Sequence, residues 1–131
     1  MAKHMYRVDI ENNGEYAFKV KSEGYEVMVN PKGNGISPSA AFLASLGACI
    51  GVYIRKYIDS AKLNIKNFRI NVKADFTKEP YVHFKEIHIL IDLGGVYLEE
   101  RRKNAFLKFI KNCPIHHTLK SSPEINMGFS S

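Results

Sequence analysis

The chain contains two cysteines, Cys49 and Cys113, and thiols are its side chains best suited to nucleophilic or redox chemistry. A thiol can be inert and buried, can bind a metal, or can be oxidised, and its surroundings decide among these. Cys49 lies in the segment SLGACIGVY, where an apolar helix usually carries a larger side chain, and Cys113 lies in NCPIHHTL. Two cysteines are too few for a secreted disulfide framework, so local context must separate the three options.

The expected helical position of each cysteine favours a different reactivity. Ser37 and Pro38 predict the N-cap and first residue of a long helix. Cys49 then lies about three turns into that helix, beyond the reach of its terminal field, where burial favours an unreactive structural thiol. Cys113 is predicted to cap a short helix that starts at Pro114. A negative charge is favoured there, so this thiol is either more easily ionised or simply a tolerated cap.

A zinc site would be formed by Cys49, Cys113, His116 and His117. Structural zinc ligands usually come as two close pairs, whereas Cys49 stands far from the other three in sequence, so we predict no metal. The chain also lacks the motifs G-x-x-x-x-G-K-[ST], H-E-x-x-H and G-x-S-x-G. The usual support for phosphate-loop enzymes, zinc proteases and serine hydrolases is therefore missing.

The elements that position these residues begin with strands. Apolar residues alternate with polar ones over residues 6–10, 16–20 and 25–29, which predicts a hairpin followed by a third strand. From Ser37 the spacing becomes helical and remains apolar on nearly every side up to Val52, so we expect this half of the helix to be buried all round.

Two glycines interrupt this helix and call for a packing reason. Gly47 and Gly51 each weaken a helix by about 1 kcal/mol relative to alanine. Small residues allow another part of the protein to approach closely, so we expect a close contact along this side of the helix.

The second half of the chain adds a hairpin and two helices. Residues 68–76 alternate strictly, and in residues 82–93 the apolar positions change parity at Lys85 and Glu86, which predicts a β-bulge there. Residues 96–113 have helical spacing, a short helix follows Cys113, and PEINMGF predicts a last strand. The order predicts a single α+β domain over residues 1–131, with antiparallel sheets wrapped around the long helix and a homodimer that encloses it.

Composition indicates a soluble globular protein, with 45% hydrophobic residues, a net charge of +6 and a pI near 9.3. No apolar run approaches the length of a membrane span and no secretory signal is visible, so we expect a cytoplasmic protein that does not contact membranes. The leading MAKHM carries no structural signal.

Residues 101–120 form a basic stretch that is either a solvated face or an anion-attracting surface: Arg101, Arg102, Lys103, Lys108, Lys111 and Lys120. Phe106 and Phe109 fall on the apolar side of this helix, which argues against nucleic-acid binding.

The segments SP…LASLGAC and NCPIHHTL, with the alternating strands between them and the final PEI strand, resemble the OsmC/Ohr family of osmotically induced proteins and organic hydroperoxide reductases. The resemblance runs from about Tyr6 to Phe129. It implies an OsmC-like fold and an intertwined homodimer, with paired central helices and active sites at the subunit interface.

The resemblance also implies roles for the two thiols. Cys49 matches the family's peroxidatic cysteine, and Cys113 matches the resolving cysteine that condenses with the sulfenic acid to form a disulfide. No tightly bound cofactor is expected, and a dithiol, often linked to lipoamide, acts as the reductant. The chain departs from the family pattern at Ser39, where the peroxidases typically have a glutamate that positions an arginine beside the thiolate. No arginine can be matched, because Arg7 has no clear correspondence and Arg55 is expected to point elsewhere.

Two functions remain open. One is a thiol-dependent peroxidase that reduces organic hydroperoxides through Cys49 and Cys113 in oxidative-stress defence. The other is a module of the same fold that binds a small thiol, a disulfide or an acyl-thioester such as coenzyme A, with the basic stretch attracting its anionic groups.

Overall fold

The computed structural model describes residues 6–130, so the MAKHM segment lies outside the described residues. It contains two antiparallel sheets and three helices, which confirms the predicted α+β class. Contacts between residues group into two compact units, Met1–Phe42 and Leu43–Ser131, each with its own architecture. The expectation that residues 1–131 form one domain stays a prediction.

The first unit is built on a three-stranded antiparallel sheet of β1 (Asp9–Asn12), β2 (Phe18–Ser22) and β3 (Tyr25–Val29). The register places Ile10 opposite Val20 and Val20 opposite Val27, so the apolar alternation of all three strands falls on one face. Between β2 and β3, Glu23 and Gly24 both have positive φ, as a two-residue type I′ hairpin turn requires. The three strands predicted from alternation are confirmed.

The long helix α1 (Pro38–Ser60) begins where its capping residues predict. The Ala40 N–H donates a hydrogen bond to Ser37 Oγ at 3.1 Å, and Pro38 is the first helical residue. The buried side carries isoleucines and a leucine at four-residue spacing: Leu46, Ile50, Ile54 and Ile58.

Burial of the first half of α1 on all sides is not what the structure shows. Ala44, Ser45, Ala48 and Val52 are exposed, because a single chain supplies packing partners for only part of the helix circumference.

By length and composition α1 could cross a membrane, with a mean hydropathy of 1.3. The sequence expectation that no apolar run reaches this length is therefore corrected. Core helices of soluble proteins meet the same criterion, and the isoleucines of α1 belong to the core of the second unit.

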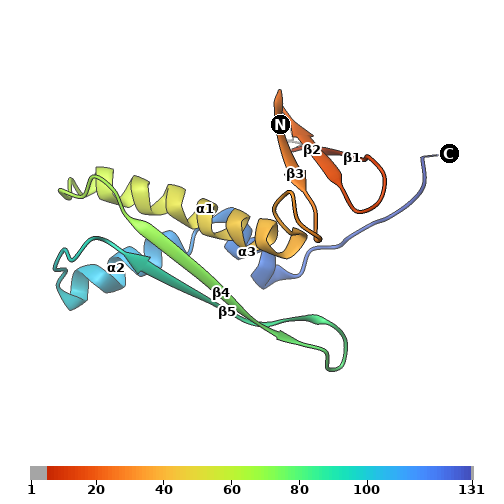
Figure 1. Cartoon of the computed structure of the whole chain (residues 1–131). Coiled ribbons are helices and arrows are strands. Elements are labelled where there is room, and N and C mark those ends of the chain that lie inside the picture. The colour runs from red at the N-terminus through yellow and green to blue at the C-terminus, as the bar shows by residue number, and fades with distance from the viewer. Residues whose placement is uncertain (1–5, 131) are drawn as a thin grey trace, which may run out of the picture. The chain divides into compact units, whose positions relative to one another are not determined.

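In the second unit, β4 (Arg69–Thr77) and β5 (His83–Asp92) form one long antiparallel hairpin (Figure 1). Asp75 pairs with Glu86 and Phe76 pairs with Phe84, which leaves Lys85 as the extra residue of a β-bulge. The predicted bulge is confirmed. It keeps the apolar residues of β5 on the face that packs on the helices.

The two helical glycines allow β4 to lie close to α1. A Cβ on Gly47 would lie 2.9 Å from Val72 Cγ2, and one on Gly51 would lie 3.2 Å from Ile70 Cδ1. The close contact predicted from these glycines is therefore made by the side chains of a strand in the same chain.

The chain ends with α2 (Glu100–Ile110), α3 (Pro114–Ser121) and an extended segment. The two helices confirm the sequence prediction, but the predicted last strand in PEINMGF is absent among the described residues. Ile125, Met127 and Phe129 are 77, 94 and 102% exposed, so no strand within residues 6–130 pairs with the segment to bury their alternating side chains.

Candidate active site at the Cys49 and Cys113 pair

The structure brings Cys49 and Cys113 together inside the second unit. Cys49 lies on α1 and Cys113 at the start of α3, and the Cys113 thiol is close enough to act on the pKa of Cys49. Cys113 is completely buried, whereas Cys49 is half-buried and packs against the same core. Both thiols are free. The two residues that the sequence singled out therefore form one site.

Cys113 is held in place by the tight connection between α2 and α3. Its N–H donates to the Ile110 carbonyl oxygen at 3.3 Å, which closes the last turn of α2. Its own carbonyl oxygen then accepts from the His117 N–H at 3.0 Å, so Cys113 is the N-cap residue of α3, with Pro114 at the first position. This confirms the capping position expected for this cysteine.

Aromatic packing fixes α2 against α1 on the side of Cys49. Tyr53 and Tyr57 lie one and two turns beyond Cys49 along the same side of α1. The Tyr53 ring lies 5.9 Å from Phe109, and the Tyr57 ring stacks on Phe106 at 4.2 Å. These contacts set the position of the α2 C-terminus, from which the chain leads directly into Cys113.

The surroundings of Cys49 favour its protonated form. Burial is the largest effect and raises the pKa of the Cys49 thiol, because a thiolate loses hydration there. The hydrogen bond with Cys113 and the charge of that neighbouring sulfur raise the pKa of Cys49 further. One contact acts in the opposite direction: a backbone hydrogen bond from Ile115 lowers this pKa, because it stabilises the negative sulfur.

The Arg55 guanidinium binds groups other than the two thiols. Its guanidinium donates to the carbonyl oxygens of Ile65 and Lys66 at 3.1 and 2.7 Å, and it forms an ion pair with Asp59 at 3.5 Å. Arg55 therefore closes the connection that follows α1, which confirms the expectation that it points elsewhere. Ser39 is exposed in the first turn of α1.

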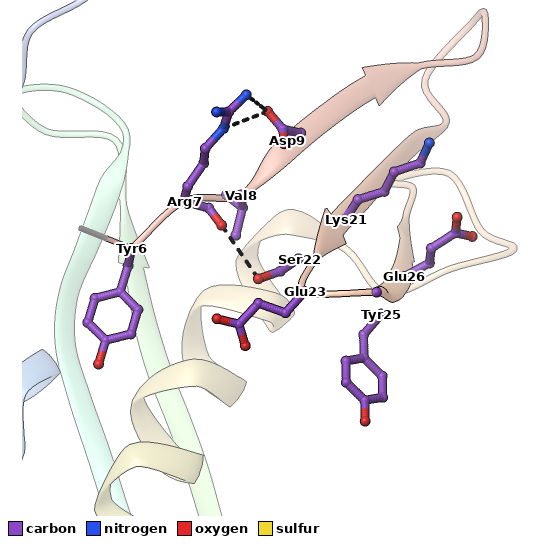
Figure 2. Close-up of a pocket in the computed structure, with 10 residues that line it drawn as sticks. Tyr6, Arg7, Val8, Asp9, Lys21, Ser22, Glu23, Tyr25 and Glu26 are labelled. Atoms are coloured by element: carbon purple, nitrogen blue, oxygen red, sulfur yellow. Dashed lines mark hydrogen bonds and ion pairs between the residues drawn. The ribbon is translucent and has the colours of Figure 1, made fainter. Parts of the chain in front are cut away.

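The other unmatched arginine, Arg7, borders an open hollow of about 830 Å³ in the first unit (Figure 2). Its guanidinium pairs with Asp9 at 3.1 Å, and its carbonyl oxygen accepts a hydrogen bond from Ser22. Tyr6 and Tyr25 lie at the rim and are largely exposed. Acidic and basic groups alternate around this hollow, so its lining favours no ligand of one charge.

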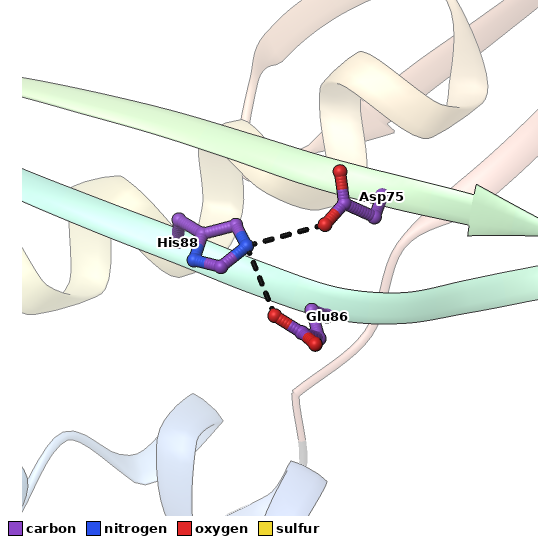
Figure 3. Close-up of side chains that lie close together, drawn as sticks. All are labelled: Asp75, Glu86 and His88. Atoms are coloured by element: carbon purple, nitrogen blue, oxygen red, sulfur yellow. Dashed lines mark hydrogen bonds and ion pairs between the residues drawn. The ribbon is translucent and has the colours of Figure 1, made fainter.

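A cluster that the sequence analysis did not single out lies on the outer face of the β4–β5 hairpin. His88 Nε2 lies 3.3 Å from Asp75 Oδ2 and 3.2 Å from Glu86 Oε2, and all three residues are exposed (Figure 3). The sequence pattern could have indicated this cluster, because the predicted bulge sets Glu86 and His88 on one face, beside the polar face of β4.

The four residues of the possible zinc site do not come together in the described structure. Among residues 6–130, the group around His88 is the only set of three or more potential metal ligands within 4.8 Å of one another. Cys49, Cys113, His116 and His117 therefore do not converge on one point. His116 instead directs Nδ1 to the carbonyl oxygen of Lys111 at 3.1 Å.

Comparisons with known proteins assign the fold. The sequence of the hydroperoxide reductase of Mycoplasma genitalium is 26% identical over 137 residues, covering 95% of this chain and 94% of that protein. The crystal structure of an OsmC-like protein from Mycoplasma pneumoniae superimposes with a TM-score of 0.78 at 20% identity, covering 92% of this chain and 91% of the other.

A more distant structure has the same architecture. The organic hydroperoxide resistance protein OhrB of Bacillus subtilis superimposes with a TM-score of 0.64 at 12% identity, covering 89% of this chain and 93% of that chain. The family described as OsmC-like protein matches residues 31–128, a range that includes both cysteines and all three helices. The chain therefore belongs to the OsmC-like protein family.

Proposed function

We propose that the protein is a thiol-dependent peroxidase that reduces organic hydroperoxides, with Cys49 as the peroxidatic and Cys113 as the resolving cysteine. The observation that carries this proposal is the closeness of two thiols that lie far apart in the sequence, since Cys113 belongs to the core against which Cys49 packs. Membership of the OsmC-like family and the similarity to a hydroperoxide reductase support a peroxide-related role.

In the first step the Cys49 thiolate attacks one oxygen of the hydroperoxide. An S–O bond forms, the O–O bond breaks, and the leaving alkoxide takes up a proton and departs as an alcohol. Cys49 is oxidised to a sulfenic acid and the peroxide is reduced. Cys49 suits this step because it is the half-buried thiol, whereas Cys113 has no exposed surface.

In the second step the Cys113 sulfur attacks the Cys49 sulfur. An S–S bond forms and the S–O bond breaks, releasing water after proton transfer to the departing hydroxide. An external dithiol of the lipoamide type then reduces the disulfide by thiol–disulfide exchange and is itself oxidised. The neighbouring thiol supports this sequence because it can trap the sulfenic acid before further oxidation.

The same proposal includes a homodimer with the active sites at the subunit interface. The exposed small residues of α1, Ala44 and Ala48, would allow two central helices to pack closely. The alternating Ile125, Met127 and Phe129 would be buried if their segment paired with a strand of the second subunit. We place the reaction in the cytoplasm, because its reducing conditions would regenerate both thiols after each turnover.

The test is peroxide consumption by the purified protein with cumene hydroperoxide and dihydrolipoamide. We expect turnover by the wild type, and a Cys49–Cys113 disulfide after one equivalent of peroxide without reductant. Cys113→Ser should react once and retain a Cys49 sulfenic acid that dimedone labels. Inactivity of the wild type across peroxides and dithiols would overturn the proposal.

A second candidate is a binding module for a small thiol, disulfide or acyl-thioester such as coenzyme A. Two observations favour it: the pKa of Cys49 is raised, and the basic residues around α2 are exposed. A thermal-shift measurement tests it. Stabilisation by coenzyme A that is lost in Arg101→Ala/Arg102→Ala, together with no peroxide turnover, would favour the module over the peroxidase.

A further inference from the structure

Asp75, Glu86 and His88 form a cluster on the outer face of the β4–β5 hairpin, apart from the two thiols (Figure 3). All three side chains are exposed, and their potential ligand atoms lie within 4.8 Å of one another. The neighbouring Ile87 and Ile89 instead pack against the core of the second unit. The cluster is therefore open to ions from solvent and is separate from the site of the thiols.

Two carboxylates of this cluster face each other across the hairpin. The register pairs Asp75 directly with Glu86, beside the β-bulge. Like charges directly opposite each other destabilise a pair of strands. Within residues 6–130, His88 is the only cationic side chain in an ion pair with either carboxylate. One imidazole carries at most one positive charge, so a second positive charge is needed to balance both carboxylates.

The distances within the cluster are long for hydrogen bonds and match the spacing of metal ligands. His88 Nε2 lies 3.3 Å from Asp75 Oδ2 and 3.2 Å from Glu86 Oε2. Charge-assisted N–H···O hydrogen bonds are usually about 2.7–2.9 Å long. Two nitrogen or oxygen ligands of a tetrahedral zinc ion, each about 2.0–2.1 Å from the metal, are about 3.3 Å apart. Nε2 also holds at most one hydrogen, whereas a metal ion can bind several such atoms at once.

One imidazole nitrogen and two carboxylate oxygens suit a divalent cation of the zinc type. Imidazole favours zinc and similar transition metals, whereas magnesium and calcium prefer oxygen ligands alone. Both carboxylates are exposed, so rotation of each side chain can bring its oxygen to the ion. Lys73 pairs with His88 across the hairpin, but it is also exposed, so its ammonium group can turn into water.

We propose that Asp75, Glu86 and His88 bind a divalent cation of the zinc type that links β4 to β5 at the bulge. The cation balances the two opposed carboxylates, and water fills the coordination positions that the three side chains leave open. Because one ligand belongs to β4 and two belong to β5, binding stabilises the paired hairpin. The site is independent of the proposed peroxidase, and its test needs no peroxide.

The first experiment measures zinc binding to the full-length chain by isothermal titration calorimetry. A Cys49→Ser/Cys113→Ser background prevents the thiols from binding the ion. We expect a zinc site whose affinity falls at least about tenfold in His88→Gln and in Asp75→Asn. Asp59→Asn, which makes the same change at an exposed carboxylate on α1, is the matched control and should leave the affinity unchanged. No zinc binding by the parent protein, or equal weakening in Asp59→Asn, would overturn the proposal.

The second experiment locates the ion in the wild-type chain, and it decides the question if the double serine variant does not fold. In ¹⁵N-labelled protein, added zinc should shift the Nε2 resonance of the His88 ring, which His88→Gln identifies. His83 lies on the same strand, with Nδ1 bonded to the Tyr81 carbonyl oxygen, and its ring should change little. An unchanged His88 ring at saturating zinc would overturn the proposal.

The third experiment tests the link between the strands. In the serine background, zinc should raise the midpoint of thermal unfolding in a concentration-dependent manner, and a chelator should reverse the shift. The zinc-dependent shift should be much smaller in His88→Gln, whereas without zinc the two proteins should unfold at similar temperatures. An equal zinc-dependent shift in both proteins would place the stabilising ion elsewhere and overturn the proposal.

Discussion

The thiol pair and the cluster around His88 both join chemically capable side chains from distant positions, but they differ in burial. Cys113 is fully enclosed and Cys49 is half-enclosed, whereas Asp75, Glu86 and His88 all lie in solvent. In an enclosed site, a neighbouring sulfur or N–H shifts the pKa of a thiol more strongly, because little water screens the interaction. The exposed groups approach one another to 3.2 and 3.3 Å, yet water and salt weaken their attraction. Proximity alone therefore does not make the two sites equivalent.

The largest expected difference is in peroxide turnover. Cys49→Ser should abolish it, because a serine hydroxyl is not ionised near neutral pH and cannot form a sulfenic acid. His88→Ala should retain wild-type turnover. Both variants are measured with cumene hydroperoxide and dihydrolipoamide, and substantial activity in Cys49→Ser or a large loss in His88→Ala would reverse the ranking of the two sites.

The pH dependence of the first turnover should follow Cys49. Burial and the neighbouring Cys113 raise the pKa of Cys49, so the protonated thiol persists above the usual range. Since only the thiolate attacks, the rate constant should increase about tenfold per pH unit on the acidic side of that pKa. Stopped-flow mixing with cumene hydroperoxide measures it. A plateau already below about pH 8, under the ordinary thiol pKa, would contradict the assigned surroundings.

Stability should respond to Cys113 by an intermediate amount. Cys113→Ala removes a fully buried sulfur and leaves a small cavity, so we expect the free energy of unfolding to fall by about 1–2 kcal/mol. Denaturant unfolding under reducing conditions measures this change. If the free energy of unfolding falls by less than a few tenths of a kcal/mol, the core repacks around residue 113, and the thiol pair is less enclosed than its burial indicates.

The smallest effect is expected at the exposed cluster. His88→Ala should change the free energy of unfolding by about 0.5 kcal/mol or less, because solvent-exposed ion pairs contribute little. Where the His88 imidazole is protonated, the difference from the wild type should decrease further in 1 M salt. A loss comparable to that of Cys113→Ala would mean that the hairpin depends on this cluster far more than its exposure indicates.

Local patterns were sufficient for most of the secondary structure. Alternation predicted β1 to β5, and the change of parity at Lys85 predicted the bulge, because a one-residue slip moves every side chain to the other face. The cap at Ser37 was also predicted from its neighbours. The failures were the burial of α1 on all sides and a strand in PEINMGF, because neither packing partners around α1 nor a pairing strand is present among residues 6–130.

The candidate site was predicted only in part. Cys49 and Cys113 were named from residue type and family resemblance, but the donor at Ile115 was missed, since a backbone N–H carries no signature in the side-chain sequence. The cluster around His88 was only partly within reach, because the predicted bulge sets Glu86 and His88 on one face, whereas the pairing of Asp75 with Glu86 was decided by the register of the hairpin.

The sequence by itself determined where strands and helices form, where α1 and α3 begin, and which two side chains can carry redox chemistry, because these follow from patterns spanning a few residues. Only the tertiary structure decided that the two thiols are neighbours at one core and that the surroundings of Cys49 raise its pKa. Those relations join segments far apart in the chain, and their distances are set by how α1, α2 and the β4–β5 hairpin pack around one core.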